Sequence, residues 1–299
     1  MNTPIARLLR IPLTIAVVGA ALVAAVPFAM SLYAPYLVRP GIFCIRVGAP
    51  VNMNGPFPAG MCRSLADLYR IPFVQLFMES MFRSLALLVG AAVLALVLGT
   101  LLGVGAGLLR RKAWAAGGII GLTTVVSAVP AFFVAYFLQI VVIIVGATPE
   151  GDKLLPVFGF GYDGHLVLPL LSVSIPAIAY TAQLTATRTA DVLDADFITA
   201  ARAKGLREGW IVAVHVMPHV RPVILEALGS GLRISVASLP IIEYLFLWRG
   251  IGQLALEAVG VHDAAGLVFC GVVLAALFAT LSAFADISRP KALYRMDAA

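Results

Sequence analysis

The chain consists of long apolar runs separated by short polar segments. About six windows of roughly 20 mostly apolar residues can be marked along its 299 residues. A helix of about 20 such residues crosses about 30 Å of hydrocarbon and satisfies its own backbone hydrogen bonds there. The windows are residues 11–32, 84–109, 118–145, 166–187, 223–247 and 266–287. This pattern predicts an all-α, polytopic membrane protein with about six transmembrane helices.

Composition supports this fold class. The chain is 61% hydrophobic and 12% charged, with a mean hydropathy of +1.00, which exceeds what a soluble core of this size requires. The first window is either a membrane anchor or a cleaved signal peptide, because Arg7 and Arg10 precede it. Its length of about 22 residues favours the anchor.

The distribution of basic residues predicts the orientation. With the N-terminus inside, 13 of the 21 Lys and Arg residues lie on the cytoplasmic side. Cytoplasmic loops of membrane proteins carry an excess of these residues. The outer loop of residues 34–79 is also basic, so the bias is moderate. We expect both termini in the cytoplasm and membrane lipid as the surroundings. No nucleic-acid partner is expected, because no basic stripe interleaved with aromatic residues lies on a soluble domain.

One polar segment, residues 191–221, lies between two apolar windows and indicates contact with something soluble. Ala200, Ala201 and Ala203 favour a helix with a low-relief face, and Gly205 permits a sharp exit from it. Four charged residues would form the polar rim of such a contact: Arg202, Lys204, Arg207 and Glu208. The alternative is an ordinary solvated loop.

The spacing in this segment resembles a known signature. Permease subunits of binding-protein-dependent ABC importers carry a Glu-Ala-Ala triplet, a later Gly and an Ile-x-Leu-Pro at their cytoplasmic coupling helix. Here residues 199–201, Gly205 and Pro218 match, with Thr199, His215 and Met217 replacing Glu, Ile and Leu. The run ARAKGL at 201–206 is similar to the B-type subunits of the dipeptide, oligopeptide and nickel branch. Similar runs begin at Ser84, Ser127, His165 and Ile242, and cover about 200 residues, from 84 to 290.

Two features depart from that branch. Arg249 stands where the branch usually has Pro, and the first outer loop is shorter than usual and contains Cys44 and Cys62. The two cysteines either form a disulfide, which an oxidising compartment would preserve, or remain free thiols. Cys270 lies within the last window.

The resemblance implies a permease subunit of an ATP-driven importer, forming half of the pathway for short peptides across the bacterial cytoplasmic membrane. It implies an N-terminal helix and outer loop (1–83), a transmembrane domain (84–290) with the coupling loop near 191–221, and a cytoplasmic tail (291–299). The implied partners are a second, homologous permease as a heterodimer, two cytoplasmic ATPase subunits that bind ATP and Mg, and an external substrate-binding protein. The implied ATPase-coupling residues are Thr199, Ala200, Ala201, Arg202, Lys204, Gly205, Leu206, Arg207 and Glu208.

The sequence contains no motif for catalysis or cofactor binding. No lysine is followed by Ser or Thr, so the phosphate-binding P-loop is absent, and zinc-protease, hydrolase-elbow and C-x-x-C patterns are absent too. His165 and His262 lack ligand spacing, so no metal site is expected. We expect a transport subunit and no enzyme, with energy supplied by separate subunits.

Polar residues inside the apolar windows are candidates for the substrate path, because such groups usually face a cavity or another helix. Arg233 either forms an ion pair, with Glu226 or with the second permease, or contacts a substrate carboxylate. Glu243 either acts at a gate or helix terminus or contacts substrate. The predicted path residues are Gln139, Tyr180, Gln183, Arg233 and Glu243.

The tract after Glu243 combines an aromatic residue with glycines. Trp248, Gly250 and Gly252 predict either a flexible outer gate or a turn anchored at the lipid headgroups.

Other functions remain open. The same architecture would import nickel or other metal chelates, or glutathione-like solutes. A secondary transporter or channel would need helices broken by Gly or Pro, and Pro130, Pro176 and Pro240 do interrupt windows. A membrane enzyme would need a cluster of catalytic polar residues, whereas the polar residues here are scattered.

Overall fold

The computed structural model describes residues 73–146, 155–260 and 263–288, and these ranges form helices joined by short turns, without a strand. The predicted all-α fold class is confirmed. The first apolar window, Cys44 and Cys62 lie outside the described residues. The predicted domain boundary at residues 83 and 84 falls within a helix that begins at Phe73.

The helices follow one another with few long connections. Two π-helical turns, η1 and η3, continue directly into α4 and α10, so that α3 to α4 and α9 to α10 are two long continuous helices. The elements are α3 (Phe73–Leu94), η1 (Ala95–Gly99), α4 (Thr100–Leu108), α5 (Ala113–Ala128), α6 (Ala131–Gly146), η2 (Gly164–Leu166), α7 (Val167–Leu193), α8 (Asp196–Ala203), α9 (Glu208–Trp210), η3 (Ile211–Val216), α10 (Met217–Phe246), α11 (Ile251–Gly260) and α12 (Ala264–Ser288).

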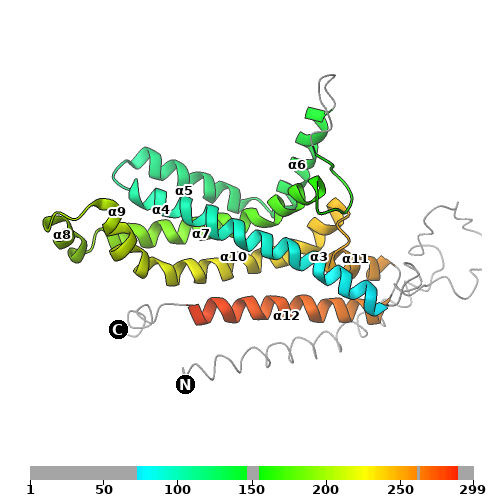
Figure 1. Ribbon diagram of the computed structural model, residues 1–299. Helices are drawn as coiled ribbons and strands as arrows, with labels where there is room; N and C mark the ends of the chain where they lie inside the picture. The colour runs from blue at the N-terminus through cyan, green and yellow to red at the C-terminus, as the bar shows by residue number, and fades with distance from the viewer. Residues whose placement is uncertain (1–72, 147–154, 261–262, 289–299) are drawn as a thin grey trace, which may run out of the picture.

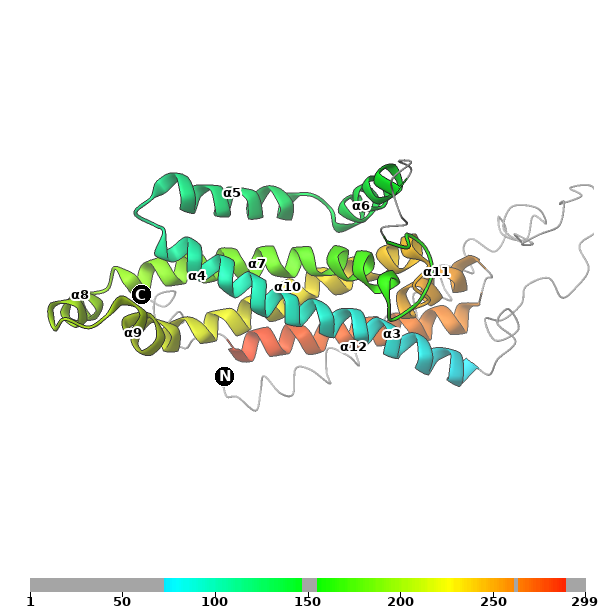
Figure 2. The ribbon, with the colours of Figure 1, turned by 45° about the horizontal axis from the view of Figure 1, so that its top comes forward.

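The long helices lie lengthwise beside one another (Figures 1 and 2). Helix α7 is central and packs against α3, α4, α5, α6 and α10, while α12 packs against α10 and α11. The short helices α8 and α9 close one end of the bundle, and α11 lies at the other end (Figure 1). We refer to these as the α8 end and the α11 end.

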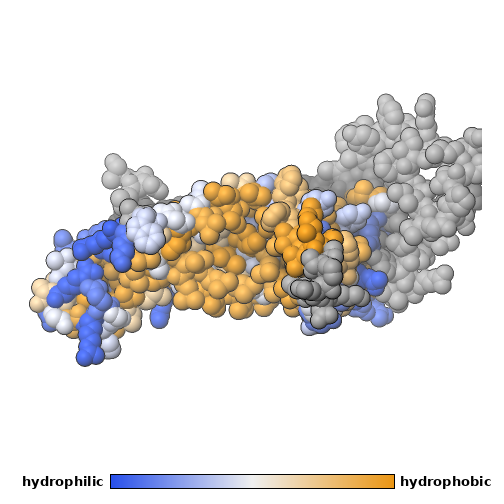
Figure 3. Space-filling model, turned by 90° about the horizontal axis from the view of Figure 1, so that it is seen from above, coloured by the Kyte–Doolittle hydropathy of each residue, from blue (hydrophilic) through white to orange (hydrophobic). Residues whose placement is uncertain are grey.

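Within the part of the chain that the structure describes, four helices are long and apolar enough to cross a membrane: Gln75–Leu108, Gly164–Leu193, Glu208–Phe246 and Gly266–Ser288. The third has 39 residues, which corresponds to about 58 Å at about 1.5 Å per residue. Because the hydrocarbon is only about 30 Å thick, part of this helix must project beyond it. Figure 3 shows an apolar surface over the middle of the bundle and hydrophilic residues at the α8 end.

The window at residues 118–145 is not one straight helix. Helix α5 ends at Ala128 and α6 begins at Ala131, with a bend of 99° between them. Val129 is extended, with φ −84° and ψ 126°, because Pro130 disfavours helical backbone in the preceding residue. Pro176 and Pro240, by contrast, lie inside α7 and α10 without ending them. Of the three prolines expected to interrupt helices, only Pro130 does so.

A row of glycines brings α4 and η1 close to α7. Gly99, Gly103 and Gly107 recur every four residues and face Thr181, Thr185 and Thr189. A Cβ atom at Gly103 would lie 2.5 Å from Thr185 Cβ and 2.6 Å from the Ala182 carbonyl oxygen. Small residues therefore permit this helix contact, as they commonly do in membranes.

Candidate coupling site

Helix α8 is a short, well-delimited helix at the tip of the bundle. It begins after Ala195, which is extended, and Asp196 places a negative charge in its first turn, where the helix dipole favours it. It ends at Ala203, and Gly205, two residues later, has a φ of +75°. The Gly205 amide donates to the Arg202 carbonyl at 2.9 Å, and the Leu206 amide donates to the Ala201 carbonyl at 3.4 Å. These two bonds form the Schellman motif, for which glycine is the preferred residue.

The two faces of α8 differ. Ile198 and Ala201 are 0% and 6% exposed and pack with Leu193, Ile211 and Val220 in a small apolar core. The opposite face, formed by Thr199, Ala200 and Ala203, is exposed. The expectation that Ala201 shares the presented face with Ala200 and Ala203 is therefore wrong, because Ala201 lies three residues after Ile198 and shares its buried side.

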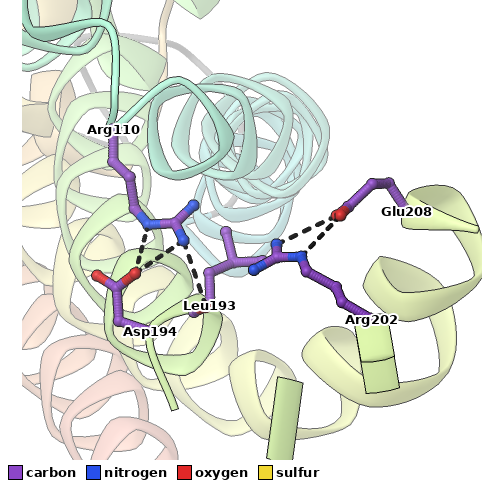
Figure 4. Close-up of polar contacts among 5 residues, drawn as sticks. All are labelled: Arg110, Leu193, Asp194, Arg202 and Glu208. Carbon is purple, nitrogen blue, oxygen red and sulfur yellow. Dashed lines mark hydrogen bonds and ion pairs between the residues drawn. The ribbon is translucent and has the colours of Figure 1, made fainter. Parts of the chain in front are cut away.

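A bidentate ion pair links the end of α8 to the start of α9 (Figure 4). Arg202 Nε donates to Glu208 Oε1 at 2.7 Å, and Arg202 Nη2 donates to Glu208 Oε2 at 3.2 Å. This hydrogen bond raises the pKa of Arg202 further above its ordinary value. The pair spans the turn that Gly205 makes, so it holds the two short helices together. Lys204, Leu206 and Arg207 lie exposed on that turn.

A second ion pair joins the turn between α7 and α8 to the turn after α4 (Figure 4). Arg110, just after α4, donates to Asp194 Oδ1 from Nε at 3.0 Å and from Nη2 at 2.8 Å, and Nη2 also donates to the Leu193 carbonyl at 3.3 Å. Arg110 thus satisfies a free carbonyl at the end of α7. Its guanidinium holds the pKa of Asp194 below the ordinary value.

No sequence pattern indicates this second pair. Arg110 is one of the basic residues that predict orientation, and Asp194 lies in the polar segment of residues 191–221. The two residues are 84 positions apart, and their contact depends on the close packing of α4 against α7.

The predicted path residues do not converge in one place. Gln139 is buried and donates to the Leu245 carbonyl at 2.9 Å, whereas Gln183 is near the surface and donates to Ser127 Oγ at 3.2 Å. Arg233 donates to Ser230 Oγ at 3.0 Å, and no ion pair among the described residues includes it. Tyr180 is half-buried in α7. Contact of these residues with substrate stays a prediction.

Glu243 is fully buried near the α11 end and binds the start of α11. Its carboxylate accepts hydrogen bonds from Ser84 Oγ at 2.5 Å and from the amides of Gly252 and Gln253 at 2.8 and 3.1 Å. Ser84 Oγ in turn accepts from the Ile251 amide at 2.8 Å. An acid at a helix N-terminus is a favourable arrangement. This geometry corresponds to the helix-terminus alternative for Glu243.

The segment from Trp248 to Gly252 is closely packed. Trp248 is 0% exposed and its indole donates to the Arg83 carbonyl at 3.1 Å, so its ring is not at a lipid headgroup surface. A Cβ at Gly250 would overlap the Glu243 carboxylate, and one at Gly252 would lie 2.5 Å from Pro240 Cα. These glycines therefore permit close approach, where the sequence suggested flexibility. A gating role stays a prediction.

A search of the described residues found no group of three or more His, Cys, Asp or Glu side chains placed to hold a metal ion.

Comparisons with known proteins identify relatives across this architecture. The family model described as binding-protein-dependent transport system inner membrane component matches residues 95–293. A peptide permease protein of Brucella ovis is 29% identical over 143 residues, which cover 47% of this chain and 45% of the relative. The chain thus spans about half the length of that relative. A peptide ABC transporter permease protein of Sinorhizobium fredii is 24% identical over 261 residues, 80% of each chain.

A glutathione transport system permease protein of Escherichia coli is 29% identical over 109 residues, 36% of each chain. The family match covers well over half of the chain and includes α8, its closing turn and the Glu243 region. The resemblance inferred from the spacing around Gly205 is confirmed. The chain is a multi-pass membrane protein and belongs to the family of binding-protein-dependent transport system inner membrane components.

Proposed function

We propose that this chain is the permease subunit of an ATP-driven importer and forms half of a pathway for short peptides across the bacterial cytoplasmic membrane. The observation that carries the proposal is α8, a short helix with an exposed low-relief face at the tip of helices too long for the bilayer. Such a helix can seat in a groove of a soluble subunit while its buried face stays attached to the bundle.

In this proposal, the ATPase subunits bind the exposed face of α8. Thr199, Ala200 and Ala203 supply the contact surface, and Lys204, Leu206 and Arg207 supply its rim. The ion pairs of Arg202 with Glu208 and of Arg110 with Asp194 act as braces. A displacement of α8 is thereby passed to α4 and α7 together. ATP shifts the equilibrium between two packings of the helices only as far as it favours one of them.

The remaining components are separate chains. Because the sequence has no P-loop lysine, two ATPase subunits supply ATP and Mg binding. A second, homologous permease completes the pathway as a heterodimer, and an external binding protein delivers the substrate. This subunit itself is not an enzyme and holds no cofactor or metal. The distribution of basic residues supports a cytoplasmic location for the α8 end and for both termini.

Short peptides are the proposed substrates because the Brucella and Sinorhizobium relatives are named as peptide permeases. Glutathione is the second candidate, since the Escherichia relative is named for its transport. Both solutes carry peptide bonds and free carboxylates, so the same polar groups along the pathway would suit both.

Uptake measurements test the proposal. Cells that lack this chain and cells in which it is restored are given labelled di- to hexapeptides and labelled glutathione, with ATP-depleted cells as controls. We expect ATP-dependent uptake of peptides only in restored cells. Equal uptake with and without the chain would reject the peptide assignment. Uptake that persists after ATP depletion would instead favour a secondary transporter.

A further inference from the structure

A small polar cavity lies at the α11 end, between the first turns of α3 and the start of α11. Its volume is about 190 Å³, and its polar lining includes Glu79, Ser80, Arg83, Arg249 and Gln253. Pockets that hold whole small molecules are usually larger, about 300–1,000 Å³. This cavity is therefore suited to one functional group of a solute. We call it the Arg249 pocket.

Arg83 is fixed in place and its charge is balanced. Its Nη2 atom lies 3.0 Å from Glu79 Oε2, and its Nη1 donates to the Arg249 carbonyl at 3.4 Å. The guanidinium carbon also lies 4.4 Å from the centre of the Phe160 ring. Glu79 and Arg83 thus neutralise each other, and Arg249 leaves the pocket with a net positive charge.

Arg249 has a fixed backbone and an available side chain. Its φ is +56°, a left-handed conformation that a residue other than glycine adopts at a cost. The Arg249 amide donates to Gln253 Oε1 at 2.7 Å, and its carbonyl accepts from Arg83. Its guanidinium, in contrast, forms no ion pair among the described residues.

A buried hydroxyl group also lines the pocket. Ser80, which lines the pocket, is only 2% exposed. Buried polar groups usually have a partner. The neighbouring amides of Ile251, Gly252 and Gln253 already bind Ser84 and Glu243. The donors that line the pocket include the Arg249 guanidinium and the Ser80 hydroxyl.

We propose that the Arg249 pocket binds a carboxylate group of the imported solute, namely the terminal carboxylate of a short peptide. Arginine binds carboxylates through two parallel hydrogen bonds, and a hydroxyl can donate a third. The pocket lies on the side opposite α8, where the solute enters in an importer. The inference rests on the proposed function, because that function supplies both the direction of transport and the peptide.

Direct binding tests the inference without the external binding protein. The assembled transporter in nanodiscs is titrated with N-acetyl-trialanine, as the free acid and as the C-terminal amide. We expect the acid to bind at least about tenfold more tightly than the amide, since hydrogen bonds between charged groups are strong. Arg249→Gln should abolish this preference, and Arg249→Lys should retain part of it. Lys112→Gln, which removes one exposed charge near the α8 end, should leave it unchanged.

Equal binding of acid and amide to the unaltered transporter would overturn the inference, as would no measurable binding of either. A preference that survives Arg249→Gln would also overturn it. Uptake in cells separates this failure from failure of the proposed function. Peptide import without a carboxylate preference would reject only the pocket. A carboxylate preference without peptide import would keep the site and reject the peptide assignment.

Discussion

At the level of single residues, the close contact of η1 and α4 with α7 requires residues without a side chain at Gly99, Gly103 and Gly107. Gly103 approaches Thr185, whereas a Cβ at Gly105 on the same helix would meet nothing within 4 Å. Gly103→Ala should therefore destabilise the protein by about 1–3 kcal/mol, because overpacking forces neighbouring groups to shift. Thermal unfolding of the detergent-purified protein measures this.

Gly105→Ala is the matched control. It adds the same methyl group in the same helix, in open space, and should leave stability unchanged or raise it slightly. Equal melting temperatures for the two variants would contradict the close contact of α4 with α7.

The ion pair of Arg110 with Asp194 leads to a prediction about pH. The Arg110 guanidinium lowers the pKa of the Asp194 carboxyl group from its ordinary value of 3.8. The pair's contribution to stability is therefore complete above that value, and it is lost only as the pH falls through the lower pKa of the folded state. Asp194→Asn should therefore reduce ATPase coupling by the same factor at about pH 6 and pH 8. Substrate-stimulated ATP hydrolysis in proteoliposomes is the measurement.

Asp191→Asn is the control for this pair. Asp191 lies in the last turn of α7, just before Asp194, and no ion pair among the described residues includes it. It should retain the coupling of the unaltered protein. A loss through Asp194→Asn that appears only at acidic pH would reject the assigned ionisation.

At the scale of elements, α8 depends on the turn that ends it. Gly205→Ala forces a side chain into a left-handed conformation, at a cost of about 1–2 kcal/mol. If the turn must keep its shape to bind the ATPase, the affinity of the two subunits should fall about 5- to 30-fold. Co-purification of the ATPase subunits with the permease measures this.

Gly209→Ala is the matched control, because Gly209 lies in α9 with open space around it. Its ATPase binding should match the unaltered protein. Full ATPase binding by Gly205→Ala would show that the turn is not part of the contact.

Sequence predicted elements better than it predicted contacts. Apolar length located α3 to α4, α7, α10 and α12, because a bilayer imposes length and composition on each helix independently. Residue spacing also located α8 through Gly205. Pro130 is one of three prolines expected to interrupt helices, but its 99° bend could not be distinguished in the sequence from Pro176 and Pro240, which lie inside continuous helices, because apolar residues continue through all three. The bonds of Glu243 to α11 were left open, because they depend on which segments meet in three dimensions.

At the scale of the whole molecule, the two ends of the bundle should lie on opposite sides of the membrane. Phe158 is exposed in the turn before α7, next to Gly159, whose amide donates to the carbonyl of Phe246 at the end of α10 that leads to α11, and Ala203 is exposed as the last residue of α8. Each is replaced by cysteine in a chain whose own cysteines are changed to serine. An impermeant thiol reagent should label Phe158→Cys in intact cells, and Ala203→Cys only after permeabilisation. The reverse pattern would invert the proposed orientation.

The proposed function depends above all on contact between the exposed face of α8 and the ATPase subunit. Cross-linking detects this contact, with single cysteines at Ala200, Ala201 and Ala203 carrying a photoactivatable reagent in the assembled transporter. We expect cross-links to the ATPase from Ala200→Cys and Ala203→Cys, and few from Ala201→Cys, because Ala201 is buried in the core with 6% of its surface exposed. Absence of cross-links from all three positions, or equal yields from all three, would contradict the proposed contact.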